Sequence, residues 1–156
     1  MAYVRIWLHC VWGTKNRTPF ITSQNKKEII SHIRDNAKDK GIYIDFINGH
    51  SEHIHCIISL GVDQALAKVM QLIKGESSFW INKFLMSKDK FEWADEYFAV
   101  SISESQLDKV REYIKNQEEH HQKKPGKKNI RNSYGIISFR MCWAKAQPLV
   151  IGNSTA

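Results

Sequence analysis

The sequence predicts an α+β protein with a ferredoxin-like (RRM-like) fold, in which an antiparallel sheet carries helices on one face. Segments rich in aromatic and β-branched residues alternate with segments whose apolar residues recur every three or four positions. In chain order they give the split βαβ series β-α-β-β-α-β, followed by one more helix. A length of 156 residues and a hydrophobic content of 42% suit one domain with its own core.

The first half of the pattern is a strand, a helix and a hairpin. Aromatic and β-branched residues predict a strand over residues 3–12, and the basic turn TKNRTP follows. A helix is expected to begin near Thr22 and to end at Gly41, a residue suited to a helix C-terminus. Strands over residues 42–48 and 53–60 complete this half.

The second half begins with a long helix that Asp63 caps. Its predicted apolar stripe consists of Leu66, Val69, Met70, Ile73 and Phe84, and Gly75 could interrupt it. A fourth strand is expected over residues 97–102, after a loop or short strand at 91–96. Ser103 or Ser105 then caps a last helix that reaches about His121.

The domain prediction is a single domain over residues 1–124 and a divergent tail over residues 125–156. The run KKPGKK at residues 123–128 breaks helices, and no strong periodicity follows it.

Charge and cysteine content narrow the class of protein. A net charge of +7 and a pI of about 9.3 favour an acidic partner such as nucleic acid. Cys10, Cys56 and Cys142 form no CxxC pair, so neither a zinc site nor a disulfide framework is indicated. No signal peptide or membrane-length apolar run is seen, and we expect a protein of the bacterial or archaeal cytoplasm with no membrane partner.

The segment EHIHCIIS at residues 52–59 places two histidines on a predicted strand. His53 and His55 are two residues apart and therefore share a face, whereas Ile54 and Cys56 point into the helix-covered core. We expect both imidazoles on the less buried face, where they would form half of a metal site. Two surface histidines without a ligand remain the alternative, because HxH alone is a weak motif.

The last predicted helix carries Tyr113 and Gln117, which lie four residues apart and share a face. A phenol oxygen can attack a phosphodiester and form a phosphotyrosine that later allows rejoining. Gln117 offers an amide oxygen beside His53 and His55, and this donor set suits Mg²⁺ or Mn²⁺ better than structural zinc. The alternative is that Tyr113 lies at the edge of the core and Gln117 is solvated.

Four segments together resemble the single-tyrosine transposases of the HUH (histidine, hydrophobe, histidine) superfamily. This is the IS200 type, to which the REP-associated tyrosine transposases are close relatives. The segments are HCVWGTKNR at 9–17, EHIHCIIS at 52–59, YFAVSIS at 97–103 and YIKNQEEHH at 113–121, in the order of the family. The resemblance covers residues 3–124.

The resemblance implies a transposase that cleaves and rejoins single-stranded DNA at the hairpin ends of a mobile element. His53, His55 and Gln117 would hold Mg²⁺ or Mn²⁺, and Tyr113 on the extra C-terminal helix would be the nucleophile. The product would be a 5′-phosphotyrosine and a free 3′-OH. A homodimer is also implied, in which the tyrosine helix of one subunit can complete the metal site of the other.

Basic and aromatic side chains supply further candidates for DNA binding. Lys15 and Arg17 in the first turn, and Lys123 and Lys124 after the last helix, are suited to hold phosphates. Four aromatic residues could stack on bases, although we favour a core role for them. They are Trp7, Trp12, Phe79 and Trp80.

The tail after Lys124 departs from the family, whose members continue with an acidic, aromatic helix. A shifted reading frame over residues 125–133 would encode such a run, so we expect a frameshift in the gene or its sequence. Coding DNA in which no single-base slip restores the helix would contradict this.

Two other functions compete with transposition. A domesticated relative would cleave genomic hairpin repeats without moving an element, and terminal hairpins that flank the gene would argue against it. A non-catalytic RNA-binding module on the same fold would expose sheet aromatics in an RNP-like pattern, of which this sequence has no clear example.

Overall fold

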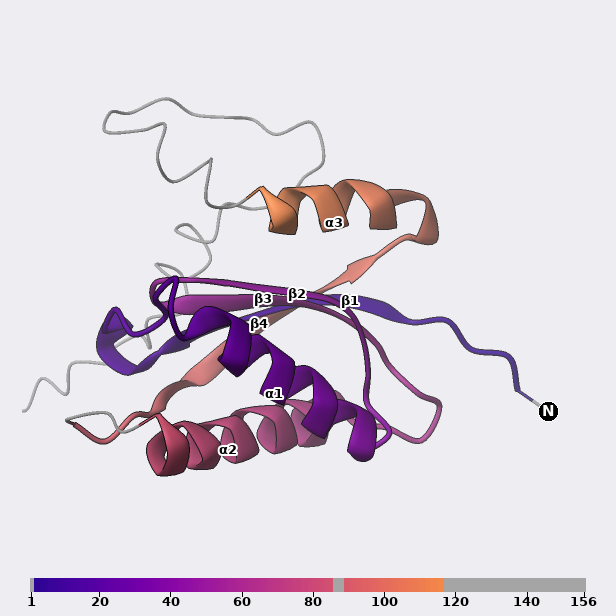
Figure 1. Ribbon diagram of the computed structural model, residues 1–156. Helices are drawn as coiled ribbons and strands as arrows, with labels where there is room; N and C mark the ends of the chain where they lie inside the picture. Colours follow the sequence, from indigo (N-terminus) through magenta and orange to yellow (C-terminus); the bar gives the residue numbers. More distant parts are fainter. Residues whose placement is uncertain (1, 86–88, 117–156) are drawn as a thin grey trace, which may run out of the picture. The chain divides into compact units, whose positions relative to one another are not determined.

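The structure is a computed structural model that describes residues 2–85 and 89–116. Four antiparallel strands form one sheet in the order β2-β3-β1-β4. Figure 1 shows α1 and α2 on one face of this sheet and α3 on the other. The strands are β1 (Trp7–Thr14), β2 (Tyr43–His50), β3 (His53–Ser59) and β4 (Trp93–Ile102), and the helices are α1 (Lys26–Asp39), α2 (Leu66–Phe84) and α3 (Leu107–Lys115).

The element order confirms the predicted α+β, ferredoxin-like fold with an extra C-terminal helix. The tail over residues 125–156 lies outside the described residues, so its divergence and the frameshift stay predictions.

The main core lies between the sheet and the two helices α1 and α2. Alternate residues of β1 and β3 point into it, and they meet the apolar stripes of the two helices. Cys10, Trp12, Ile54, Cys56 and Ile58 from the strands are all fully buried. Trp12 therefore has the core role that we favoured, and is not available to stack on a base.

α1 ends at Asp39, and the glycine that the sequence indicates, Gly41, directly follows the C-cap residue Lys40. Gly41 has a φ of 69°, the left-handed conformation that residues with a Cβ atom adopt at a cost. The backbone N–H groups of Gly41 and Ile42 donate to the carbonyls of Lys38 and Ala37. These bonds satisfy carbonyls at the helix end and turn the chain into β2.

Two strand boundaries differ from the prediction. β1 begins at Trp7 and not at residue 3, because both neighbouring strands end opposite Trp7, at Ser59 and Ile102. β4 is one long strand that begins at Trp93, since its first residues pair with β1 beyond an irregularity near Thr14.

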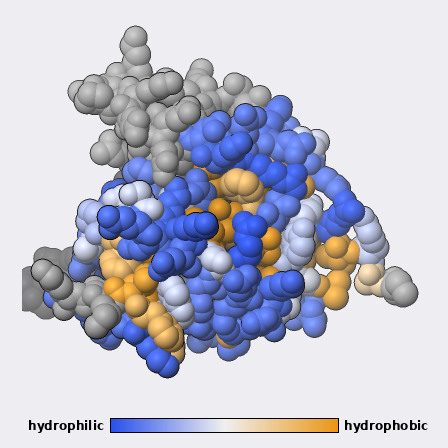
Figure 2. Space-filling model, viewed as in Figure 1, coloured by the Kyte–Doolittle hydropathy of each residue, from blue (hydrophilic) through white to orange (hydrophobic). Residues whose placement is uncertain are grey.

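α2 runs through Gly75 without interruption. The expected stripe is wrong at its end: Phe84 is 57% exposed, and the buried row stops one turn earlier at Ile81. Phe79 is also exposed, contrary to the core role we favoured for it. Apolar side chains gather near this end of α2 in Figure 2.

α3 is preceded by a short 3-10 turn, η2 (Glu104–Gln106), and ends at Lys115 with Asn116 as its C-cap. The helix therefore begins later and ends earlier than expected. Its apolar stripe, Leu107, Val110 and Ile114, is buried, and α3 contacts β2 and β3. α3 thus covers the part of the second sheet face that β2 and β3 form.

None of the helices in the described part of the chain has the length and apolar run that a membrane span requires.

Candidate functional site

The two strand histidines lie side by side beneath α3. His53 and His55 alternate along β3 with Ile54 and Cys56, so their imidazoles point away from the main core. The two residues are 4% and 2% exposed, and their ring centroids are 5.0 Å apart. The expectation of a less buried face is therefore wrong, because α3 packs over it.

A third histidine, His9 on β1, joins this pair from the neighbouring strand. Antiparallel pairing sets Val11 opposite His55 and Ile57 opposite His9, so the two histidines are diagonal neighbours on one face. Nε2 of His9 lies 2.9 Å from Nδ1 of His55, a hydrogen-bond distance. Burial lowers the pKa of His9 to about 4, so its imidazole is neutral near neutral pH.

Tyr113 reaches the same cluster from α3. The centroid of its ring lies 6.2 Å from that of His55 and 6.4 Å from that of His9, and both contacts are edge-on. The nucleophile expected from the sequence and one expected metal ligand thus meet within a single chain. Gln117 lies outside the described residues.

Two polar contacts anchor α3 to β2. Arg111 donates from Nε and Nη2 to the two carboxylate oxygens of Asp45, at 2.7 and 2.6 Å. The Asp45 side chain is only 9% exposed, which shields this ion pair from solvent. Asn48 donates from Nδ2 to the backbone carbonyl of Ile114 at 2.9 Å, next to Tyr113. These contacts fix the height of the tyrosine above the sheet.

The described donors do not by themselves make a complete metal site. No group of three or more His, Cys, Asp or Glu side chains within residues 2–85 and 89–116 is placed to hold a metal ion. His53 and His55 would therefore need ligands of another kind, such as an amide oxygen or water. His55 uses Nδ1 toward His9, so Nε2 on the other side of its ring is the atom that would face a cation. Neutral imidazoles fit a divalent metal.

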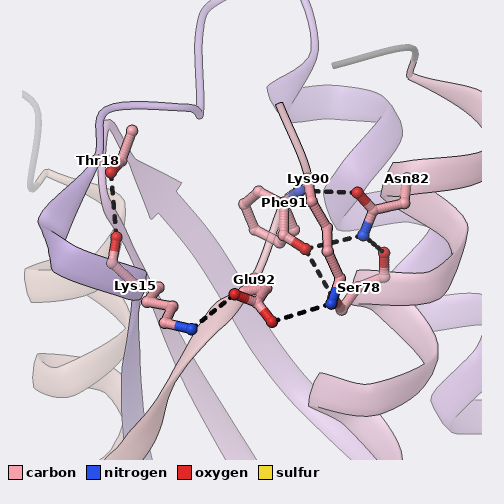
Figure 3. Close-up of polar contacts among 7 residues, drawn as sticks. All are labelled: Lys15, Thr18, Ser78, Asn82, Lys90, Phe91 and Glu92. Atoms are coloured by element: carbon pink, nitrogen blue, oxygen red, sulfur yellow. Dashed lines mark hydrogen bonds and ion pairs between the residues drawn. The ribbon is translucent and has the colours of Figure 1, made fainter. Parts of the chain in front are cut away.

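The basic turn after β1 forms a short 3-10 turn, η1 (Lys15–Arg17), held by carboxylates. Lys15 Nζ lies 2.7 Å from a carboxylate oxygen of Glu92 (Figure 3). Arg17 makes an ion pair with Glu52, the residue directly before His53. Both expected phosphate contacts are thus matched by acidic partners, and Arg17 is tied to the histidine strand. Lys123 and Lys124 lie outside the described residues.

Sequence reasoning gave no role to His9, although it begins one of the quoted segments. A lone histidine within a strand resembles many others until the pairing partner and register are known. The signal available was spacing: Trp7, His9 and Val11 alternate with the core residues Cys10 and Trp12.

A family model described as "Transposase IS200 like" matches residues 2–117. A protein from Deinococcus radiodurans R1, described as a transposase, has a similar structure, with a TM-score of 0.61 and 20% identity over 75% of this chain and 95% of that one. A REP-associated tyrosine transposase bound to a REP hairpin gives a TM-score of 0.56 and 20% identity, over 78% of this chain and 72% of that one. No curated protein matches the sequence.

Proposed function

Because the chain belongs to the IS200-like transposase family, we propose that it cleaves and rejoins single-stranded DNA through a covalent bond to Tyr113. The observation that carries this proposal is the position of the Tyr113 ring, which lies against His55 in the histidine cluster. A phenol buried against apolar residues alone would suggest packing. A phenol beside paired imidazoles suggests chemistry at a phosphate.

The proposed reaction exchanges one phosphodiester for another. Oη of Tyr113 attacks the scissile phosphorus, and the bond between phosphorus and the 3′ oxygen breaks. The phenol proton ends, in the net reaction, on that 3′ oxygen, so the products are a 3′-OH and a 5′-phosphotyrosine. Attack of a 3′-OH on the phosphotyrosine reverses these steps and joins the strands, without any external energy source.

His53 and His55 would hold Mg²⁺ or Mn²⁺, with Gln117 as the proposed third ligand. When bound, a divalent cation polarises the scissile phosphate and stabilises the charge that develops on it. Burial of the two imidazoles keeps them in place and limits competition from water.

The proposed substrate is a DNA hairpin at the end of a mobile element. The REP hairpin in the similar structure supports a DNA partner, and the surplus of basic residues favours the same choice. Lys15 and Arg17 would hold phosphates close to the site, and Arg17 is the better placed because its partner Glu52 adjoins His53. Lys123 and Lys124 remain candidates for the same role.

We also propose that the site is completed within one chain. Tyr113 and His55 of the same chain are already in ring contact, and Arg111 ties α3 to the chain's own β2. A homodimer remains a prediction, because two cleavages need two tyrosines, but exchange of α3 between subunits is not required for assembly of the site.

The test uses a single-stranded hairpin substrate labelled at one end or the other. With Mg²⁺, the 3′-labelled strand should remain attached to the denatured protein, and the 5′-labelled strand should be released with a 3′-OH. The 3′-labelled strand is the one attached because the phosphate that bonds to Tyr113 stays on the 5′ end of the downstream strand.

Tyr113→Phe and a chelator should each abolish the adduct, whereas Tyr43→Phe, an exposed tyrosine on β2, should leave it unchanged. Adduct formation that persists in Tyr113→Phe would refute the nucleophile. Cleavage undiminished by the chelator would refute the metal requirement.

A further inference from the structure

We propose that His9 is a positioning residue: it accepts a hydrogen bond from Nδ1–H of His55 and thereby holds His55 in the tautomer whose Nε2 can bind a divalent cation. The inference rests on the proposed function, because it assigns His9 a role at the metal site. His9 itself contributes no ligand.

The geometry of the pair supports this role. The distance of 2.9 Å between His9 Nε2 and His55 Nδ1 is that of a direct hydrogen bond. Both residues are almost fully buried, at 4% and 2% exposure, so water is a poor competitor for the bond. The rings are held by two paired strands, and their relative position is therefore fixed by the register of β1 and β3.

Proton accounting gives the direction of the bond. A neutral imidazole carries one N–H, and its other nitrogen has the lone pair that a metal needs. If His55 donates from Nδ1, its Nε2 carries the lone pair and can bind a cation. If His9 were the donor, the proton of His55 would lie on Nε2, and that nitrogen could not be a ligand. The tautomer of His9 thus decides whether His55 can bind metal.

Packing alone is a poor explanation of this residue. A buried polar side chain costs free energy unless it makes a hydrogen bond, and its neighbour on the same strand face, Val11, is apolar. The His9 ring also contacts Tyr113, so a single residue touches both the expected ligand and the expected nucleophile. Metal-bound histidines usually have such an acceptor on the second ring nitrogen.

The first test reads the tautomers in the wild-type protein without metal or DNA. Long-range ¹H–¹⁵N NMR correlations should show His55 protonated at Nδ1 and His9 protonated at Nδ1, with lone pairs on both Nε2 atoms. A His55 ring protonated at Nε2 would overturn the inference, whatever the protein does with DNA.

The second test measures Mn²⁺ binding by electron paramagnetic resonance in the absence of DNA. His9→Phe keeps a ring but removes the acceptor, and should weaken Mn²⁺ binding about 10- to 100-fold. His9→Gln keeps an acceptor oxygen and should retain most of the affinity. His32→Gln is the matched control, because His32 lies in the α1–α2 layer against Trp80 and should bind Mn²⁺ as the wild type does.

The outcomes separate this inference from the proposed function. Folded His9→Phe with wild-type Mn²⁺ affinity overturns the role of His9 and leaves the proposed function standing. A wild-type protein that binds no Mn²⁺ overturns the proposed metal dependence and this role with it. If His9→Phe does not fold, a loss of affinity in His9→Gln equal to that of His55→Ala would count against the inference.

Discussion

Lys15 is a single basic residue whose availability to a DNA phosphate is reduced by an acidic partner, Glu92. Its hydrogen bond to Glu92 lowers the pKa of that carboxyl, so Glu92 is charged near neutral pH and competes with phosphates for the ammonium group. Glu92 also accepts from Lys90, and it therefore neutralises part of two basic side chains (Figure 3).

Replacing Glu92 should consequently strengthen DNA binding. We expect Glu92→Gln to raise the affinity for single-stranded DNA several-fold and to steepen its dependence on salt, because one more cation becomes available to phosphates. Fluorescence anisotropy at a series of salt concentrations measures both quantities. Glu28→Gln, on α1, changes the net charge by the same amount; an equal gain there would show that only total charge matters.

The sequence predicts some residues of the site and not others, for a physical reason. His53 and His55 could be placed on one face because alternation along a strand is a local property. His9 could not be joined to them, because its diagonal contact with His55, 46 positions later, depends on the register between two strands that are distant in the sequence. The ion pair between Asp45 and Arg111 could likewise not be predicted, since it joins a strand to a helix 66 positions later.

At the scale of elements, the docking of α3 depends on Arg111. Asp45→Asn should cost about 1–2 kcal/mol of stability, because it removes the carboxylate from a bidentate pair in which the Asp45 side chain is only 9% exposed. The substitution should then increase the rate of hydrogen exchange in α3 more than in α1. The yield of covalent adduct should fall as well, since Tyr113 would lose its fixed position.

Asp108 provides the control for this prediction. It bonds the same guanidinium, but its side chain is 93% exposed. Asp108→Asn should therefore change the stability by only a few tenths of a kcal/mol. Equal effects of the two substitutions would contradict a specific role for Asp45.

Two glycines give opposite predictions for one substitution. Gly41→Ala should destabilise the protein by about 1 kcal/mol, because alanine is strained at the positive φ that ends α1. Gly75→Ala should stabilise it by up to about 1 kcal/mol, because the position is helical and a Cβ there meets nothing within 4 Å. Urea denaturation measures the free energy of unfolding of both variants. Changes of the same sign would contradict the different backbone conformations of the two glycines.

The sequence predicts which elements exist better than where they end or on which side they pack. Helical spacing in Leu107, Val110 and Ile114 reveals that the last helix has a buried face. It does not reveal which surface that face covers. The start of β4 could not be predicted either, because residues 93–96 lack strict alternation of apolar and polar residues. They belong to the strand because this part of the chain pairs with β1.

At the scale of the whole molecule, assembly of the site within one chain makes a prediction about mixtures. Tyr113→Phe and His55→Ala should each be inactive, and an equal mixture of the two should remain inactive because no chain has both groups. If subunits exchanged α3, mixed dimers would restore about a quarter of the wild-type adduct, since half of the dimers would be mixed and each would have one intact site. Gel analysis of adduct from mixtures that have been allowed to exchange subunits decides between these outcomes.

The most direct measurement is to find which amino acid carries the DNA. Protein trapped with a short single-stranded hairpin and Mg²⁺ can be digested with nuclease and protease, and the nucleotide-bearing peptide can be sequenced by mass spectrometry. We predict that the nucleotide is attached to Tyr113, in the peptide from α3. Attachment to Tyr3, Tyr43, Tyr97 or Tyr134, or to any residue that is not a tyrosine, would contradict the assignment of Tyr113 as the nucleophile.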